Sequence, residues 1–346
     1  MSKPLRPTSL VALLLALTLA LAGCSSSTAT STATADPGST NQGVAFPVTV
    51  DTAYGKVTVE KKPQRIVVLV PEFLGHLALV GEKNVVTGGA PSDLDDMPWL
   101  TYEGEFDAKL FTADYSTSVE AVAAQKPDLI LTNVWGSDAK EYKQLSQIAP
   151  TYVGRYTQDE GGANTWRESL ADVVALTGHD PKILSDAEAD YAATLKAAAD
   201  KLPGLQGKTF QLGVLSREDQ QLWLTEYAND PITGLGLRLG EGQPSGKDGS
   251  VAAKAPKYSM ENIDKLNADV VFIVTHQYAD PDGKFLASLK KDPRVPELPA
   301  AKNGTLVYLY GPQWGAVQEP TPASVKWWLG QVLPQLEKSA LNQSGQ

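Results

Sequence analysis

Short stretches in which nearly every residue is apolar recur along the chain, and segments typical of helices separate them. Such stretches predict buried strands, and their alternation with helices predicts an α/β fold. Strands that are apolar on both faces belong to mostly parallel sheets covered by helices on both sides. The predicted strands are residues 57–59, 66–70, 85–86, 128–131, 151–153, 210–215, 270–275 and 306–309, and the predicted helices are 73–80, 118–125, 138–148, 166–177, 180–201, 260–266 and 322–336.

Two helical segments in succession interrupt this alternation near the middle of the chain. Gly178 ends the first segment, and Asp180-Pro181 suits the start of a longer helix, which Pro203-Gly204 ends. We therefore predict two similar α/β lobes joined by a single long helix. The predicted parts are an N-terminal lobe over residues 46–160, connecting helices over 161–206 and a C-terminal lobe over 207–340.

The beginning of the chain has a pattern typical of exported lipoproteins. Lys3 and Arg6 precede an apolar run over residues 10–21, which is short for a membrane-spanning helix of ~20 residues. The run ends at Leu21-Ala22-Gly23-Cys24. This order predicts a signal peptide over residues 1–23 that is removed before Cys24, whose thiol then carries a diacylglycerol anchor. An uncleaved signal anchor with an incidental cysteine is the alternative reading.

Composition narrows the picture further. Residues 24–45 are rich in Ser, Thr, Ala, Pro and Gly and are predicted to be a flexible tether between membrane and folded domain. Cys24 is the only cysteine, so the folded part has no thiol pair for a disulfide and depends on its hydrophobic core. The formal net charge of −10 argues against nucleic acid as a partner.

Several short sequence fragments follow one another in a characteristic order along residues 60–336. They are Pro63-Gln64-Arg65-Ile66-Val67, Leu79-Val80-Gly81, Ser118-Val119-Glu120-Ala121-Val122, Lys126-Pro127-Asp128-Leu129-Ile130, the "LSQIAP" of residues 145–150, residues 258–263, residues 267–272 and Asn303-Gly304. In this order they resemble the siderophore, haem and vitamin B12 class of ABC-transporter solute-binding proteins. The chain departs from that pattern at residues 72–76, where a Leu-Asp pair is common, and at 240–257, where the loop is long.

The resemblance implies two Rossmann-like lobes joined by one long helix, and a protein that captures a ligand without chemistry. It implies a lipid-anchored, extracytoplasmic monomer that delivers a ferric siderophore to the permease of an ABC importer. The iron belongs to the chelator, so no cofactor and no protein metal site are expected. Haem and cobalamin remain alternative ligands, because all three need aromatic walls and a few polar anchors.

Glu120 and Glu261 match the two surface glutamates that in this family meet arginine pockets on the permease. A carboxylate on each lobe forms charge-assisted pairs with arginine and sets the docking orientation. Each residue also has a local reading. Thr117-Ser118-Val119-Glu120 has the form of a capping box, and Glu261 lies in a first helical turn, where a negative charge is favourable without any partner.

Residues that directly follow the predicted strands are the candidates for ligand binding, because parallel sheets bind ligands at the carboxyl ends of their strands. Two arginines among them suit an anionic chelate, and the aromatic side chains offer broad apolar surface with few rotors. Trp223 and Tyr227 either pack or line the cleft, whereas Trp166, Trp327 and Trp328 are assigned to helix packing. The predicted ligand-binding residues are Trp135, Arg155, Tyr156, Arg217, His276, Tyr278 and Trp314.

Two other classes of protein fit the sequence less well. An exported enzyme would need catalytic chemistry, but the chain has no G-x-S-x-G elbow, no phosphate-binding G-x-x-x-x-G-K-[ST] and no G-x-G-x-x-G after the first strand. A direct metal-ion binder would use His76, His179 and His276, whose spacing is unlike that of metal motifs. We therefore predict a binding protein that is not an enzyme.

Overall fold

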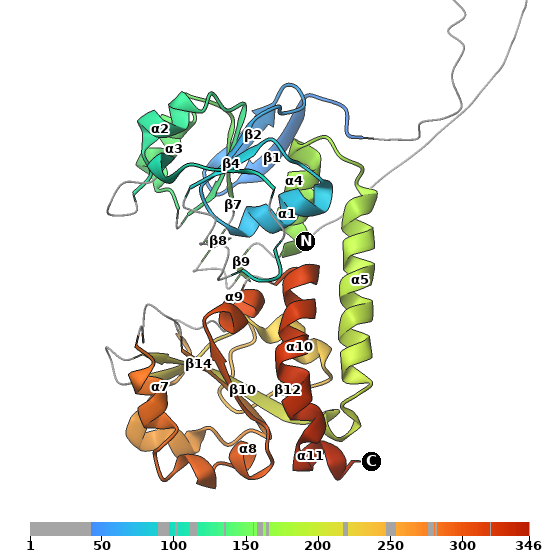
Figure 1. The fold of residues 1–346 in the computed structure, drawn as a ribbon, viewed down its shortest axis with the longest axis vertical. Coiled ribbons are helices and arrows are strands. Elements are labelled where there is room, and N and C mark those ends of the chain that lie inside the picture. Colours follow the sequence, from blue (N-terminus) through green and yellow to red (C-terminus); the bar gives the residue numbers. More distant parts are fainter. Residues whose placement is uncertain are drawn as a thin grey trace, which may run out of the picture. The chain divides into compact units, whose positions relative to one another are not determined.

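A computed structural model describes most of the chain between Gly43 and Gly345, and Asn41–Gln346 group into one compact unit (Figure 1). The described residues are 43–88, 97–100, 103–110, 116–134, 136–154, 156–157, 162–163, 166–216, 221–246, 254–275, 280, 282–318 and 320–345. The predicted signal peptide and Cys24 lie outside these ranges. Within them, no helix combines the length and the apolar character needed to cross a membrane.

The N-terminal sheet is parallel throughout its described strands, as the apolar pattern predicts. Its strand order is β5-β4-β3-β6-β7, with β3 (Ile66–Val68) in the centre. Ile66 pairs with Val85 on one side and with Leu129 on the other. The other strands are β4 (Val85–Thr87), β5 (Glu105–Phe106), β6 (Leu129–Asn133) and β7 (Thr151–Gly154).

An antiparallel hairpin precedes this sheet. It consists of β1 (Val48–Thr52) and β2 (Gly55–Val59), of which the sequence pattern indicated only residues 57–59. The backbone N–H of Ala53, between the two strands, donates to the carbonyl of Val153 in β7 at 3.0 Å. The hairpin is therefore attached to the edge strand of the N-terminal sheet.

The C-terminal sheet is mixed. Its order is β13-β11-β10-β14-β15, and β12 also pairs with β10. The strands β10, β14 and β15 run parallel, whereas β11 is antiparallel to both β10 and β13. The bounds are β10 (Thr209–Ser216), β11 (Gln221–Leu224), β12 (Arg238–Leu239), β13 (Lys257–Ser259), β14 (Val270–Thr275) and β15 (Leu306–Tyr310).

Most predicted helices are present with small shifts at their ends. The segment predicted as a helix over residues 260–266 is instead a 3-10 helix, η5 (Met260–Lys265), with a non-helical backbone at Asn262. Gly81 adopts a φ of 78° directly after α1, which explains the glycine that ends this helix. The helices are α1 (Glu72–Val80), α2 (Val119–Ala124), α3 (Ala139–Leu145), α4 (Trp166–Leu176), α5 (Lys182–Ala199), α6 (Asn229–Gly234), α7 (Lys284–Leu289), α8 (Pro299–Lys302), α9 (Pro312–Gln318), α10 (Pro322–Lys338) and α11 (Ala340–Gln343).

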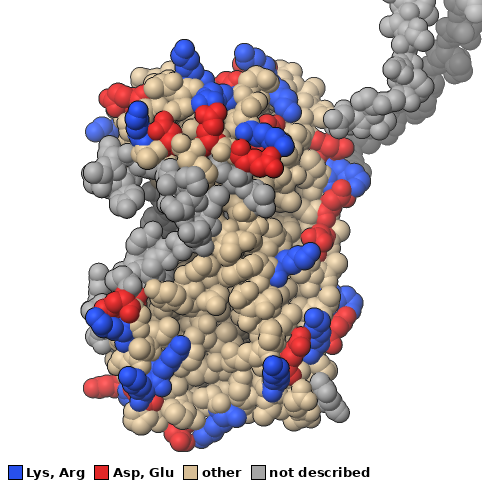
Figure 2. Space-filling model, viewed as in Figure 1, with Lys and Arg blue, Asp and Glu red and all other residues tan. Residues whose placement is uncertain are grey.

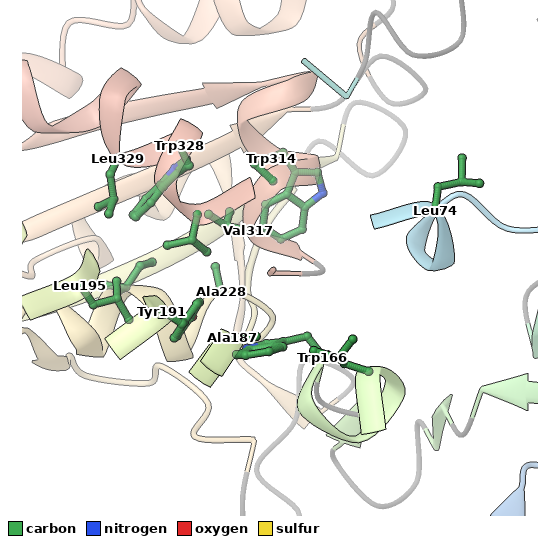
Figure 3. Close-up of a cluster of buried hydrophobic side chains, with 14 of the residues drawn as sticks. Leu74, Trp166, Ala187, Tyr191, Leu195, Ala228, Trp314, Val317, Trp328 and Leu329 are labelled. Atoms are coloured by element: carbon green, nitrogen blue, oxygen red, sulfur yellow. The ribbon is translucent and has the colours of Figure 1, made fainter. Parts of the chain in front are cut away.

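In the sequence, α4 and α5 come after the strands of the N-terminal sheet and before those of the C-terminal sheet. Helix α5 packs against α4, α6 and α10 (Figure 1). One buried apolar cluster contains residues from both sheets and from these helices. Figure 3 shows part of it, with Leu74 from α1, Trp166 from α4, Tyr191 from α5 and Trp328 from α10. Trp166 and Trp328 are buried, so their assignment to helix packing is confirmed.

Candidate functional site

The carboxyl ends of β3, β6 and β7 lie next to one another, because these three parallel strands are neighbours in the sheet. Glu72 begins α1 shortly after β3, Asn133 ends β6 and Gly154 ends β7. This is the edge at which open parallel sheets bind ligands. It therefore forms the best-described part of the candidate site.

Two hydrogen bonds fix the side chain of Asn133, which is 7 % exposed. Its Oδ1 accepts from the backbone N–H of Gly136 at 2.8 Å, and its Nδ2 donates to Oε2 of Glu72 at 2.8 Å. Because a backbone N–H can only donate, the amide oxygen must face Gly136 and the amide nitrogen must face Glu72. The amide thus sets the position of the carboxylate.

Two glycines lie beside this pair, and the space around Gly136 is the tighter of the two. A Cβ on Gly136 would lie 2.6 Å from Cγ1 of Val70 and 2.8 Å from Oγ1 of Thr132. A Cβ on Gly154 would lie 3.3 Å from the ring of Phe73 and 3.7 Å from Oε1 of Glu72. A side chain at residue 154 would therefore contact Phe73, Asn133 and Glu72.

At the corresponding edge of the C-terminal sheet, β14 ends at Thr275 and α9 follows β15. The hydroxyl of Thr275 is buried and has no hydrogen-bond partner in the described part of the protein. Trp314 of α9 is only 6 % exposed and packs edge-on against Tyr227, with ring centroids 6.4 Å apart. Figure 3 shows Trp314 in the buried cluster, between Trp328 and Leu74 in this view. In this structure it offers little open surface to a ligand.

The other predicted ligand-binding residues are not described at the level of side chains. Tyr156 is placed only as part of strand β8 (Tyr156–Thr157), which pairs with β9 (Gly162–Ala163). Trp135, Arg155, Arg217, His276 and Tyr278 lie outside the described residues. Their roles stay predictions. The rule that selected them, a position directly after a strand, also applies to Glu72, which sequence reasoning treated only as a departure from the family pattern.

Glu120 lies in the first turn of α2 and is exposed. The cap of this helix is Ser118, whose hydroxyl accepts from the backbone N–H of Ala121 at 3.4 Å. The capping-box alternative for Glu120 is therefore wrong, because the helix begins one residue later than that reading requires. In the described part of the chain, no hydrogen bond or ion pair holds the Glu120 carboxylate.

Glu261 is exposed in the first turn of η5 and borders a groove of about 590 Å³. Arg294, in the same groove, donates from Nη1 to the backbone carbonyl of Glu261 at 3.0 Å. The guanidinium of Arg294 also pairs with Asp292, and this hydrogen bonding lowers the pKa of Asp292 to about 2. The positive charge of Arg294 is thus largely balanced within the chain. The groove is lined by Glu261, Asn262, Asp264, Pro293, Arg294, Glu297, Leu298 and Pro299.

The two described histidines lie in different surroundings. His76 of α1 is 3 % exposed, and its Nδ1 has no hydrogen-bond partner in the described part of the protein. His179 places its Nε2 2.8 Å from Oε1 of Glu82. Across the described ranges, no group of three or more His, Cys, Asp or Glu side chains is arranged to hold a metal ion.

Acidic and basic side chains alternate on the face drawn in Figure 2, mainly at its upper and lower ends and along its right edge. The area between them is mostly uncharged. This view contains no large basic surface of the kind that binds nucleic acid.

The family model described as periplasmic binding protein matches residues 66–312. The chain therefore belongs to the periplasmic binding protein family, which confirms the resemblance seen in the sequence. Members of this family bind solutes and are not a class of enzymes, so the prediction that the chain is not an enzyme is supported as well.

Individual relatives match over most of their length. The ferric enterobactin-binding periplasmic protein FepB of Escherichia coli is 28% identical, and the alignment covers 76% of this chain and 83% of FepB. The probable siderophore-binding lipoprotein YfiY of Bacillus subtilis is 28% identical, with coverage of 63% and 66%. The crystal structure of Streptococcus pneumoniae PiaA in complex with ferrichrome has a TM-score of 0.62 and 23% identity, and covers 85% of this chain and 99% of PiaA. This structural likeness confirms the α/β fold class.

Proposed function

We propose that this protein is the extracytoplasmic solute-binding component of an ABC importer and that it captures a ferric siderophore. The observation that carries the proposal is the family match over residues 66–312, together with relatives named for ferric enterobactin and for siderophores. The ligand binds at the carboxyl edges of the two sheets, where Glu72, Asn133 and the predicted arginines and aromatic residues meet the strand ends. Neither haem nor cobalamin is favoured by any described feature.

Capture proceeds without chemistry and with limited movement of the two predicted lobes. Arg167 of α4 supports this view, because its Nη1 lies 3.3 Å from Oδ2 of Asp230 in α6, and its Nε lies 3.5 Å from Oε1 of Glu188 in α5. Tyr191 of α5 donates its hydroxyl to the same Asp230 at 2.8 Å. These contacts join three helices around the connection between the sheets. The proposed boundaries remain 46–160, 161–206 and 207–340.

Ligand binding is tested by titrating the full chain, purified in detergent, and following tryptophan fluorescence. The panel contains ferric siderophores of the hydroxamate, catecholate and carboxylate types, haem, cobalamin and ferric ion without a chelator. We expect submicromolar binding of at least one ferric siderophore and weaker binding after Arg155→Ala or Arg217→Ala. Binding of only haem, cobalamin or bare iron would keep the family and overturn the proposed ligand.

Delivery to the permease is proposed to use Glu120 and Glu261 as the two docking carboxylates. Both are exposed on described surfaces, and each lies in the first turn of its helix. Charge reversal by Glu120→Arg or Glu261→Arg should leave ligand affinity unchanged and abolish stimulation of the permease ATPase in proteoliposomes. The matched control is Glu60→Arg, which reverses an exposed carboxylate directly after β2. Equal losses in all three variants would refute specific docking.

The membrane attachment is proposed to be a lipid on Cys24, supported by the sequence order at residues 21–24. Cys24→Ala should block removal of residues 1–23 and leave the protein without the mass of the lipid. Mass spectrometry of the membrane fraction measures both effects. An unmodified Cys24 in the mature chain would refute the anchor without affecting the proposal for the ligand.

A further inference from the structure

The guanidinium of Arg294 is fixed by two parallel hydrogen bonds to Asp292. Nε of Arg294 donates to Oδ1 of Asp292 at 2.9 Å, and Nη2 donates to Oδ2 at 2.6 Å. The backbone N–H of Arg294 also donates to Oδ1 of Asp292 at 2.9 Å. Two parallel bonds between a planar guanidinium and a carboxylate set the orientation of the whole group. The remaining nitrogen of the guanidinium, Nη1, therefore points in a fixed direction.

This Nη1 donates to the backbone carbonyl of Glu261 at 3.0 Å, and the two residues are 33 positions apart in the chain. Glu261 lies in the first turn of η5, a 3-10 helix of six residues whose backbone is non-helical at Asn262. Long 3-10 helices are uncommon because their hydrogen-bond geometry is poor, so a turn of this kind gains stability from a contact outside the helix. Arg294 thus holds the backbone beside the Glu261 carboxylate.

The side chain of Glu261 itself stays available. It is exposed, and in the described part of the chain no hydrogen bond or ion pair is made by its carboxylate. The hydrogen bond to Asp292 is the main cause that raises the pKa of Arg294, and the charges of Glu261 and Asp264 raise it by less. The positive charge of Arg294 is therefore paired with Asp292 rather than with Glu261.

Resting on the proposed delivery of the ligand to a permease, we propose that Arg294 is a positioning residue for docking. It holds the backbone of Glu261 so that the carboxylate faces an arginine of the permease. If Arg294 acted only through its charge, it would repel such a partner, and its removal would strengthen docking. If Arg294 positions Glu261, its removal weakens docking, because the carboxylate that binds the partner is no longer held. The direction of the change therefore distinguishes the two roles.

The first measurement needs only this protein. Hydrogen exchange, followed by mass spectrometry over residues 257–266, is compared between the full chain and Arg294→Ala, both purified in detergent. We expect the amides at the start of η5 to exchange about five-fold faster in the variant, because one exposed charge-assisted hydrogen bond is lost. Arg238→Ala is the matched control, since Arg238 of β12 is also exposed and its Nε donates to the carbonyl of Gly207 at 2.7 Å. It should leave these amides unchanged.

The second measurement is the concentration of binding protein that gives half-maximal stimulation of the permease ATPase in proteoliposomes. Arg294→Ala should raise this concentration by about three-fold or more, because one of the two docking carboxylates is no longer held. In a Glu261→Ala background the same substitution should change it by less than about two-fold, because the positioned residue is absent. Arg294→Lys should resemble Arg294→Ala, since an ammonium lacks the planar fork that contacts Asp292 and Glu261 together. The affinity for the ligand should be the same in all variants.

Several outcomes would overturn the positioning role of Arg294. One is unchanged exchange at the start of η5, and another is faster exchange that Arg238→Ala produces equally well. Tighter docking by Arg294→Ala would point to charge alone, and equal losses with and without Glu261 would show that Arg294 acts independently of it. If Glu261→Ala docks as well as the unaltered chain, the proposed docking through Glu261 fails, and the role of Arg294 in docking fails with it, whatever the exchange of η5 shows.

Discussion

Replacing His76 with leucine should remove a large part of the pH dependence of stability between pH 4 and 6.5. His76 lies on the buried face of α1, next to Phe73, with a ring-centroid distance of 6.4 Å. Burial lowers the pKa of His76 from its usual 6.5 to about 4, because the imidazolium would lose its hydration without gaining a partner. The folded protein therefore holds this ring neutral where the unfolded chain protonates it.

The sign and size of the effect follow from the two pKa values. Above pH 6.5 the ring is neutral in both states, and the folded state has its full stability. As the pH falls from 6.5 to 4, the unfolded chain binds a proton that the folded chain refuses, so the free energy of unfolding decreases. A difference of about 2.5 between the pKa values corresponds to about 3 kcal/mol, with a slope of at most about 1.4 kcal/mol per pH unit.

The assay is urea denaturation followed by circular dichroism at several pH values from 4 to 8, with linear extrapolation to zero denaturant. His76→Leu should match or exceed the stability of the unaltered chain near pH 5, because it removes both the titrating ring and the Nδ1 that has no partner in the described structure. Carboxylates titrate in both proteins, so their contribution cancels when the two curves are subtracted.

Phe73→Leu is the matched control, since it alters the neighbouring buried ring and leaves the histidine in place. It should lower the free energy of unfolding by about 1–3 kcal/mol at every pH and keep the original slope. The reasoning is refuted if the curves for the unaltered chain and His76→Leu run parallel from pH 6.5 to 4. It is also refuted if Phe73→Leu flattens the curve as much as His76→Leu does.

Three further substitutions test packing, hydrogen bonding and capping. Gly136→Ala should lower the free energy of unfolding by about 1–3 kcal/mol in chemical denaturation, because its Cβ would overlap two side chains. Gly330→Ala lies in open space on α10 and should raise that free energy by about 0.5–1 kcal/mol. Equal effects of the two substitutions would contradict this account. Tyr191→Phe should cost about 1 kcal/mol through loss of the bond to Asp230, and an unchanged denaturation midpoint would show that this bond contributes nothing. Thr321→Ala should lower the thermal midpoint by removing the capping box of α10, at a cost of about 1 kcal/mol, and Thr321→Ser should restore it.

The local pattern of apolar residues was sufficient to predict the central strands of both sheets. The apolar segments that became β3, β6 and β14 are buried along their whole length, as are residues 210–215 of β10, and continuous burial of short segments suits strands in a covered parallel sheet. The end of a helix could also be predicted where a local residue determines it, as Gly81 does for α1. A residue with a left-handed backbone ends a helix independently of tertiary contacts.

The pairing of strands that lie far apart in the sequence could not be predicted from the sequence pattern. The mixed C-terminal sheet depends on the short strand β11, whose partners β10 and β13 are chosen by tertiary packing. The 3-10 form of η5 was also not indicated by the sequence pattern, which predicted a helix over residues 260–266.

The candidate site also has features that the sequence predicts and features that only the folded structure shows. The rule of strand ends selected the carboxyl edges of the two sheets as the proposed ligand site, because the direction of parallel strands is implied by their order with helices. The contact between Glu72 and Asn133 joins residues 61 positions apart, and its orientation depends on a third group, the N–H of Gly136. No local pattern encodes such a contact. The sequence by itself indicated the family, most of the elements and the sheet edges at which a ligand is proposed to bind. The tertiary structure decided which side chains meet there, because hydrogen bonds and packing act between atoms that only the folded chain brings together.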